Sequence, residues 1–279
     1  AGVLETTKGS LLATTFTSNA YDEYYLKKGS HKKWPEERRT RWLAAHNRVP
    51  ATARKSELGT WMIRSTDGGV TWSPRYDSLV NSPHGPVNLK DGRVLYAGKN
   101  LWRKPEKTWV GVCESKDDGQ SWKRLAQIPT RKGDDPKDYH ELHAAEATNG
   151  NLIVQIRNHN KKSAGETLQS ESKDGGKTWS EAHSIGVWGL PSQLLRLNDG
   201  RLLMSYGHRR KPFGNQARVS DDHGKTWSEP VIVSGDGAGG DLGYPSTVQL
   251  DDGSLITVWY EKLAKSSFAV LRQAQWTLS

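Results

Sequence analysis

The sequence predicts an all-β fold, a single-domain propeller built from four-stranded antiparallel blades. Two repeats predict it: an octapeptide that occurs four times, and a strand–turn–strand segment that occurs five times. Self-similarity with a period of about 40 to 50 residues is typical of propellers, because each blade must stack on its neighbours to bury its apolar faces. A chain of 279 residues is long enough for one such domain.

The octapeptide has the form S-x-D-x-G-x-(S/T)-W, and its serines lie 50, 57 and 48 residues apart. Its aspartate can accept hydrogen bonds from the amides of its own turn, and its glycine adopts a positive φ without steric strain. The tryptophan is expected to bury its ring against the sheet. We therefore interpret the octapeptides as structural turns that carry no chemistry. They span Ser65–Trp72, Ser115–Trp122, Ser172–Trp179 and Ser220–Trp227.

The second repeat is a short strand, a tight turn of the Asp-Gly or Asn-Gly kind, and a strand rich in apolar residues. This pattern is a strong hairpin signal. A third strand is predicted before each octapeptide and a fourth after its tryptophan. The last of the five units ends with Phe268–Leu278 and has no octapeptide. The hairpins span Val3–Thr15, Val87–Ala97, Ala145–Ile156, Leu194–Ser205 and Val248–Trp259, and the third strands Thr60–Ser65, Trp109–Ser115, Thr167–Ser172 and Gln216–Ser220.

One segment interrupts the repeats. Ser18–Ser56 is predicted to be an insertion in the first blade, and Pro35–His46 within it is a candidate helix. We interpret the insertion as a solvated excursion from the blade, and a lid over an anionic ligand is the second interpretation. Its basic residues include Lys27, Lys28, Lys32, Lys33, Arg38, Arg39 and Arg41.

The composition limits the classes of partner. Forty basic and 31 acidic residues give a net charge of +9, which favours acidic sugars and other polyanions. Nucleic acid is the less favoured partner, because the charge is scattered and no recognised nucleic-acid motif occurs. The only cysteine, Cys113, falls on a predicted strand and is expected to be a buried, inert thiol. No apolar run approaches the roughly 18 residues of a membrane span.

Polar residues recur where the inner strands of successive blades are expected to converge. A propeller binds its ligand over the central channel, so these residues are candidates for a site. Their five histidines predict a polar pocket that titrates near neutral pH. A metal is not expected, since His140 and His143 lack the helical spacing of a zinc peptidase. The segments are Ser82–Pro86, Tyr139–His143, Arg157–His159, Gly189–Ser192, Gly207–Arg210 and Asp241–Ser246, and the histidines are His84, His140, His143, His159 and His208.

The octapeptides resemble the Asp-boxes of the sialidase-like β-propellers, which lie between the third and fourth strands of a blade. Glu141–Arg157 (ELHAAEATNGNLIVQIR) resembles the segment of that family in which a glutamate precedes a hairpin that ends in a substrate-binding arginine. Tyr244–Glu261 (YPSTVQLDDGSLITVWYE) resembles the segment that supplies the family's nucleophilic tyrosine.

The resemblance implies roles for individual residues. Tyr244 would be the nucleophile, Glu141 the base that takes its proton, and Arg157 a binder of the substrate carboxylate. This chemistry requires no metal and no organic cofactor. The further substrate-binding residues that we predict are His84, His140, His159, His208 and Arg209.

The chain departs from the family at three points. No Arg-Ile-Pro tripeptide supplies the first arginine of the family's triad, and the third would have to be Arg209, Arg210 or Arg218. The acid aspartate before the first box has no counterpart, and Glu57 and the more remote Asp22 are the candidates in its place. The family has six blades whereas five are countable here. We therefore expect a six-bladed architecture whose first blade, preceding Ala1, is missing or reorganised.

Three hypotheses of function stay open. The first is a sialidase-like exo-glycosidase that acts on sialic acid or a related acidic sugar. A sialoside carries a carboxylate on its anomeric carbon, which repels a carboxylate nucleophile but not a neutral tyrosine. The second is a lyase or hydrolase of uronic-acid or rhamnose-containing polysaccharides that uses the histidines. The third is a propeller that binds glycans without catalysis. A secreted or periplasmic location is expected, and the sequence does not indicate an oligomeric state.

Overall fold

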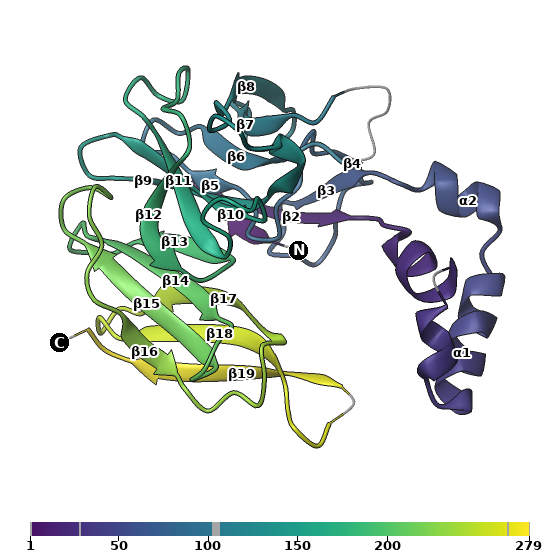
Figure 1. The fold of residues 1–279 in the computed structure, drawn as a ribbon. Helices are drawn as coiled ribbons and strands as arrows, with labels where there is room; N and C mark the ends of the chain where they lie inside the picture. The colour runs from purple at the N-terminus through teal and green to yellow at the C-terminus, as the bar shows by residue number, and fades with distance from the viewer. Residues whose placement is uncertain (1, 28, 102–106, 267, 279) are drawn as a thin grey trace.

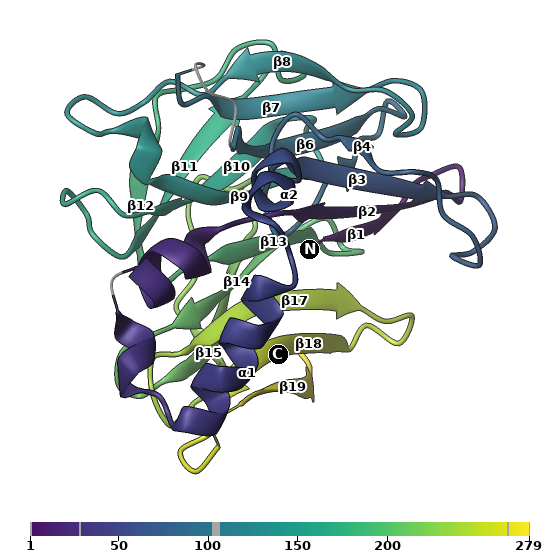
Figure 2. The ribbon, with the colours of Figure 1, turned by 90° about the vertical axis from the view of Figure 1, so that its right-hand side faces the viewer.

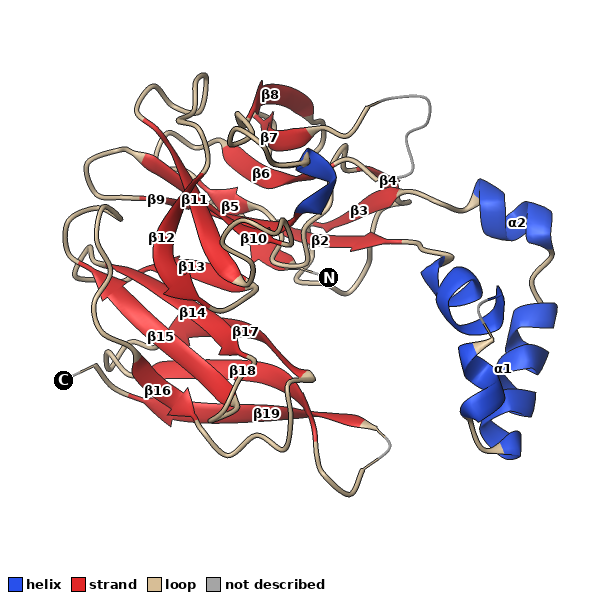
Figure 3. Ribbon diagram, viewed as in Figure 1, coloured by secondary structure: helices blue, strands red, loops and turns tan. Residues whose placement is uncertain are grey.

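The computed structural model describes residues 2–27, 29–101, 107–266 and 268–278. Its strands form five antiparallel sheets arranged as the blades of a propeller (Figure 1), and strands dominate the chain outside one helical segment (Figure 3). Blades 1 to 4 each have four strands in sequential order, and blade 5 has three. The described residues thus form five blades, the number counted in the sequence, and they form no sixth.

The strands follow the predicted repeat closely. Blade 1 holds β1 (Val3–Glu5), β2 (Leu11–Phe16), β3 (Thr60–Ser65) and β4 (Tyr76–Asp77); blade 2 holds β5 (Val87–Asn88), β6 (Val94–Lys99), β7 (Val110–Ser115) and β8 (Lys123–Gln127). Blade 3 holds β9 (Tyr139–Glu146), β10 (Leu152–Asn158), β11 (Glu166–Ser172) and β12 (His183–Trp188); blade 4 holds β13 (Ser192–Arg196), β14 (Leu202–His208), β15 (Gly214–Ser220) and β16 (Val231–Ser234). Blade 5 holds β17 (Leu242–Gln249), β18 (Leu255–Lys262) and β19 (Ala269–Trp276).

The apolar core lies between successive blades. Leu12 and Met62 of blade 1 pack with Tyr96 of blade 2, and the buried Cys113 belongs to the same cluster, as the sequence predicted. Equivalent clusters join each later pair of blades. Stacking of this kind explains why a repeated amphipathic sheet, rather than a single large core, stabilises the chain.

The four octapeptides adopt one turn. In the third copy, Asp174 accepts hydrogen bonds from the amide and hydroxyl of Thr178, at 2.9 and 2.6 Å, and from the hydroxyl of Ser172. These donors hold the pKa of the Asp174 carboxyl below its usual range. The indole of Trp179 donates to the carbonyl of Gly176 at 2.9 Å, and its ring is buried. The structural interpretation of the octapeptides is therefore confirmed.

One octapeptide departs from the expected burial of its tryptophan. Trp122, Trp179 and Trp227 each pack into the cluster between their own blade and the preceding one. Trp72 in blade 1 is 38% exposed, because the described residues place no blade before it. The prediction that every octapeptide tryptophan is buried against a sheet is wrong at this position.

The insertion between β2 and β3 forms a helical arm, Ser18–Ser56. It contains the short helical turns η1 (Asp22–Lys27) and η2 (Ser30–Lys33) and the helices α1 (Glu36–Asn47) and α2 (Ala51–Ser56). The arm projects from the ends of β2 and β3, and α1 crosses in front of the strands of blades 4 and 5 when seen from that side (Figure 2). The candidate helix of the sequence is α1, whereas α2 was not predicted. Among the described helices, including η3 (Pro136–Asp138), none is long and apolar enough to cross a bilayer.

Candidate active site

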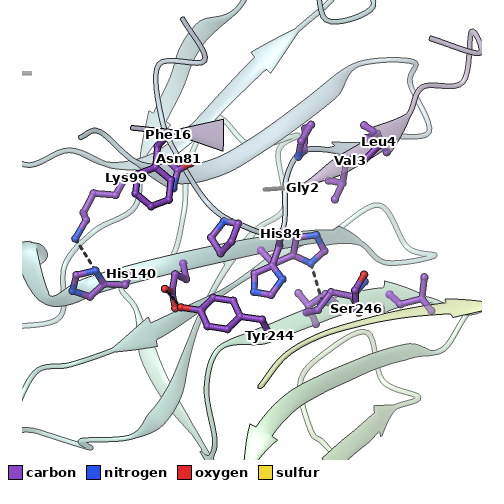
Figure 4. Close-up of a pocket in the computed structure, with 18 of the residues that line it drawn as sticks. Gly2, Val3, Leu4, Phe16, Asn81, His84, Lys99, His140, Tyr244 and Ser246 are labelled. Atoms are coloured by element: carbon purple, nitrogen blue, oxygen red, sulfur yellow. Dashed lines mark hydrogen bonds between the residues drawn. The ribbon is translucent and has the colours of Figure 1, made fainter. Parts of the chain in front are cut away.

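A cavity of about 1030 Å³ lies where the first strands of the five blades meet (Figure 4). The first strand of each blade begins at this end of the ring, and the second strand ends here, because consecutive strands are antiparallel. The octapeptides follow the third strands and therefore lie at the opposite end. The residues predicted from the sequence at the blade mouths consequently share one end of the molecule with the cavity.

Glu141 and Tyr244, which both line the cavity, are placed by β-bulges. On β9, Glu141 and Leu142 together oppose one residue of β10, and on β17, Tyr244 and Pro245 together oppose one residue of β18. Glu141 has a φ of 43° and Tyr244 a φ of 54°, a left-handed conformation that non-glycine residues rarely adopt. A bulge re-aims the side chain that it carries, and strained backbone of this kind concentrates at functional sites.

The two bulges bring three side chains from blades 3 and 5 into contact. The phenol of Tyr244 donates a hydrogen bond to Oε1 of Glu141. Arg157, on β10, donates from Nη1 to Oε2 of Glu141 at 2.5 Å and to the phenol oxygen of Tyr244 at 2.9 Å. The Arg157 and Glu141 side chains are 13% and 22% exposed, so the group is largely shielded from water yet open to a ligand.

The electrostatics of this group favour the protonated phenol. Burial and the adjacent Glu141 carboxylate raise the pKa of Tyr244 well above its usual value, although Arg157 and Arg209 oppose the rise. Glu141 also raises the pKa of Arg157 against the effect of burial, so the guanidinium stays charged. A phenol that is neutral at rest can become a nucleophile only if its proton passes to Glu141 during the attack.

A second arginine faces the same tyrosine. The guanidinium carbon of Arg209 lies 5.8 Å from the centre of the Tyr244 ring, within the range of a cation–π contact. Its Nε and Nη2 atoms are buried, and no described residue forms a hydrogen bond with them. Gly243 lies against this guanidinium, and its φ of 126° is a conformation that side-chain-bearing residues rarely adopt.

The other two candidates for the third arginine are engaged elsewhere. Arg218 donates to the hydroxyl of Tyr206 at 3.1 Å and to the carbonyl of Ser228 at 2.6 Å, within blade 4. Arg210 lies over the ring of Trp188, with its guanidinium carbon 3.7 Å from the ring centre. Of the three arginines considered from the sequence, the structure brings Arg209 to the tyrosine.

Two histidines line the cavity beside Tyr244. The His84 ring stacks on Tyr244 with centres 6.4 Å apart, and it contacts the buried His143 at 5.2 Å. Nδ1 of His143 accepts the backbone N–H of Leu194 at 2.9 Å. The Nε2 atom of His84 is buried and has no partner.

Two more histidines, His140 and His159, lie next to Glu141 and Arg157. The His140 and His159 rings lie 4.7 Å apart. Nε2 of His159 accepts from Nε of Arg157 at 2.8 Å, and Nδ1 of His140 lies 3.0 Å from Nζ of Lys99 (Figure 4). Both histidines therefore act as acceptors toward a cationic side chain.

The prediction that the histidine pocket titrates near neutral pH is wrong for His84, His140 and His143. Burial lowers the pKa of His143 to about 4, and burial together with Lys99, His159 and Arg157 lowers that of His140 to about 3. Burial also lowers the pKa of His84 and of His159. Charged imidazoles are disfavoured because these rings have lost water and face cations.

Arg157, His159 and Arg209 do not line the cavity but contact residues that do, whereas His208, Glu57 and Asp22 lie apart from it. His208 has Nδ1 3.0 Å from the carbonyl oxygen of Pro212 and packs edge-on against Trp188. Glu57 pairs with Arg75 at the neck of the arm, and Asp22 begins η1 within the arm. Neither acid lines the cavity, so among the described residues that line it Glu141 is the one carboxylate.

Lys99 lines the cavity and was missed in the sequence. It ends β6, and its side chain is buried, with Nζ donating to the carbonyl of Lys137 at 2.9 Å. Burial lowers the pKa of Lys99 to about 8, although Asp138, Glu141 and Asp135 oppose the shift. Its place in the repeat could have identified it. Lys99 is the last residue of the second strand of blade 2, and Arg157 is the last but one of the second strand of blade 3. Among the described residues, no cluster of histidine, cysteine and carboxylate side chains is arranged to hold a metal.

The chain is similar to known proteins in sequence and in fold. A family model described as a BNR repeat-like domain matches residues 63–257. A sialidase of Bacteroides fragilis (strain YCH46) is 24% identical over 257 residues, which cover 83% of this chain and 44% of that protein. The chain thus spans less than half of the length of that relative.

Two solved structures share the fold. A Dyadobacter fermentans protein of unknown function has a TM-score of 0.72 at 24% identity, over 99% of this chain and 75% of its own. The NanB sialidase of Streptococcus pneumoniae has a TM-score of 0.58 at 18% identity, over 78% of this chain and 35% of its own. At these identities the likeness shows the propeller fold alone.

Proposed function

The chain belongs to the family of BNR repeat-like domains, and we propose that it is an exo-acting glycoside hydrolase that releases an acidic sugar, sialic acid or a close relative, from a glycan. The observation that carries the proposal is the contact of Tyr244, Glu141 and Arg157 at the mouth of the cavity. A phenol, a carboxylate and a guanidinium from two blades meet there on strained backbone. The sialidase that matches in sequence supports the same class of substrate.

The chemistry that this geometry supports is a covalent displacement. The phenol oxygen of Tyr244 attacks the anomeric carbon while its proton passes to Glu141, with which it is already hydrogen-bonded. The bond between the anomeric carbon and the departing oxygen breaks, and that oxygen takes a proton from water at the open mouth. Water then attacks the anomeric carbon and breaks its bond to Tyr244, while Glu141 returns its proton to the phenol oxygen. The proton that the attacking water loses passes to solvent, where it neutralises the hydroxide formed in the first step.

Cations around the cavity support an anionic substrate. Arg157 and Arg209 both adjoin the tyrosine, and Arg209 has two donor atoms without a partner. An arginine fork binds a planar carboxylate through two parallel hydrogen bonds. Lys99, buried in the wall, adds a third positive charge below its pKa of about 8.

The test compares two tyrosines at the cavity. An aryl α-sialoside is incubated with the wild type, with Tyr244→Phe and with Tyr260→Phe, whose ring lies 5.8 Å from that of Tyr244 and whose hydroxyl binds Asp241. We expect Tyr244→Phe to lower kcat at least about a thousandfold with the fold intact, and Tyr260→Phe to retain most of the activity. Comparable turnover in Tyr244→Phe would eliminate the mechanism, and binding without product in the wild type would favour a non-catalytic glycan-binding propeller.

A second candidate is a lyase or hydrolase of uronic-acid or rhamnose-containing polysaccharides that uses histidine. The partnerless Nε2 of His84 beside Tyr244 favours it. In that case His84→Ala would abolish product formation from a uronate polymer, while Tyr244→Phe would change it little. Secretion or a periplasmic location suits either activity and stays a prediction.

A further inference from the structure

The helical arm begins at the rim of the cavity. Phe16, the last residue of β2, lines the cavity and pairs with Thr60, the first residue of β3. The backbone of Thr17 still donates to the carbonyl of Gly59 at 3.0 Å, and the arm begins beyond that bond. The second strands of all blades end on this rim, so the arm stands at the same end of the ring as Tyr244 (Figure 2).

The arm is held together by its own aromatic side chains. The Trp42 ring contacts those of Tyr21, Tyr25 and Trp34, with centres 5.3 to 6.3 Å apart. The hydroxyl of Tyr21 lies 3.1 Å from Nδ1 of His46. Within the described residues, neither α1 nor α2 makes an extensive contact with a blade. The arm is therefore a compact unit that packs on itself rather than on the propeller.

The arm also carries most of the net charge of the chain. Residues 18–56 contain ten basic and four acidic side chains, a net charge of +6 out of +9 for the whole sequence. Two of the four acids, Glu36 and Glu37, occupy the first turn of α1, where the helix dipole already favours them. Folding does not explain this charge, because like charges in a compact unit repel one another.

A second cavity lies on the arm itself. Tyr21, Arg41, Trp42, Ala45 and His46 enclose about 330 Å³ on one side of α1. Trp42 is 36% exposed and Arg41 is exposed, so an aromatic face and a guanidinium border the same opening. An aromatic ring that stacks on a sugar, beside a cation that binds its acidic group, is suited to an acidic saccharide.

We propose that the arm binds an acidic glycan chain beyond the terminal sugar that occupies the propeller cavity. Arg41 and Trp42 bind one acidic residue of the chain at the arm cavity, and the exposed Lys32 and Lys33 attract the rest. This inference rests on the proposed function for the identity of the terminal sugar. A nucleic acid carries a similar charge, but the arm begins beside Phe16, which lines the propeller cavity, and this position favours the glycan.

The test measures binding in a Tyr244→Phe background, so that nothing is consumed. Isothermal titration at two salt concentrations compares an α2,8-linked sialic acid oligomer with a single methyl α-sialoside. The test variant carries Lys32→Gln, Lys33→Gln, Arg38→Gln and Arg41→Gln. The matched control removes the same charge at the opposite end of the ring, with Lys116→Gln, Lys173→Gln, Lys177→Gln and Lys225→Gln in the octapeptides.

We expect the oligomer to bind at least tenfold tighter than the single sugar, and this gain to disappear in the arm variant but not in the control. A second variant joins Thr17 to Gly59 through an Asn-Gly turn, which the strand register permits, and it should lose the same gain. A gain that survives both changes would overturn the proposal. Equal, arm-dependent binding of a DNA duplex would assign the arm to nucleic acid instead.

The outcomes separate this inference from the proposed function. If the single sialoside does not bind but the oligomer binds through the arm, the arm proposal holds and the choice of terminal sugar fails. If the single sialoside binds equally well in all variants and the oligomer adds nothing, the arm proposal fails alone.

Discussion

The guanidinium of Arg209 lies 5.8 Å from the ring centre of Tyr244, and two of its buried nitrogens have no hydrogen-bond partner among the residues that the structure describes. A buried donor without a partner is costly, by about 1 to 3 kcal/mol, and more when it is charged. A ligand carboxylate placed between Arg209 and Arg157 would satisfy these donors.

Arg209→Met should therefore raise KM for an acidic sugar substrate by about tenfold or more and change kcat much less, because the lost contact is present in both ground and transition states. Arg210→Met is the matched control, since Arg210 lies over Trp188 rather than over Tyr244. Steady-state kinetics of both variants on one aryl glycoside check the prediction. Equal effects of the two substitutions would remove Arg209 from the binding site.

We expect substrate binding to depend on pH, because the pKa of Lys99 is lowered. Its pKa is lowered to about 8, so the side chain is charged below that pH and neutral above it. We expect KM for an anionic substrate to rise about fivefold or more between pH 7 and pH 9, as this charge is lost. Lys99→Met should have the raised KM already at pH 7 and a flat profile to pH 9. A wild-type KM that does not change over this range would show that Lys99 does not contact the substrate.

We expect the stability of the fold to depend on pH, because burial lowers the pKa of His143. Its folded pKa of about 4 lies below the unfolded value of 6.5, so protons bind preferentially to the unfolded chain. The resulting stability is present above pH 6.5 and is lost as the pH falls from 6.5 toward 4. Between pH 7 and pH 5 this group alone should lower the free energy of unfolding by about 2 kcal/mol.

Urea unfolding at the two pH values checks this prediction for the wild type, His143→Gln and the control His223→Asn, which changes a histidine of the fourth octapeptide. The glutamine variant should lose less stability on acidification than the wild type. An unchanged slope in His143→Gln would show that other groups cause the acid sensitivity.

We also expect kcat/KM to depend on the leaving group of the substrate. Where the structure describes the cavity wall, Glu141 is the one carboxylate in it, and it is hydrogen-bonded to Tyr244. Protonation of the departing oxygen is then left to water, so kcat/KM should rise steeply with the acidity of the leaving group, by about tenfold or more between methyl and nitrophenyl glycosides. Similar rates for the two substrates would reveal an acid that assists departure.

Local signals in the sequence predicted the blades, because both repeats depend on nearest neighbours in the chain. The turn glycines and the hydrogen bond from the Thr178 amide to Asp174 need only a few adjacent residues, and the structure has them as predicted. The exposure of Trp72 and the lowered pKa of His140 depend instead on which blade or cation lies opposite, which no local pattern encodes.

The meeting of Glu141 with Tyr244 was predicted from a family resemblance, and not from any pattern that fixes distance. Their bulges left one trace in the sequence, Pro245, since proline within a strand is confined to edges and bulges. No such trace marks Glu141. Lys99 lay in a position equivalent to Arg157 but had no motif around it, so its burial in the wall became evident only from the three-dimensional arrangement.

Because Glu141 and Tyr244 lie on bulges, their side chains could be lost from the site without changing the rest of the fold. Deleting one residue from either would restore a regular pleat and turn the acid or the phenol to the other side of its strand, while every octapeptide and hairpin turn stays in place. Under the proposed mechanism, the loss of a single codon would thus end catalysis, and the chain would still assemble the same blades.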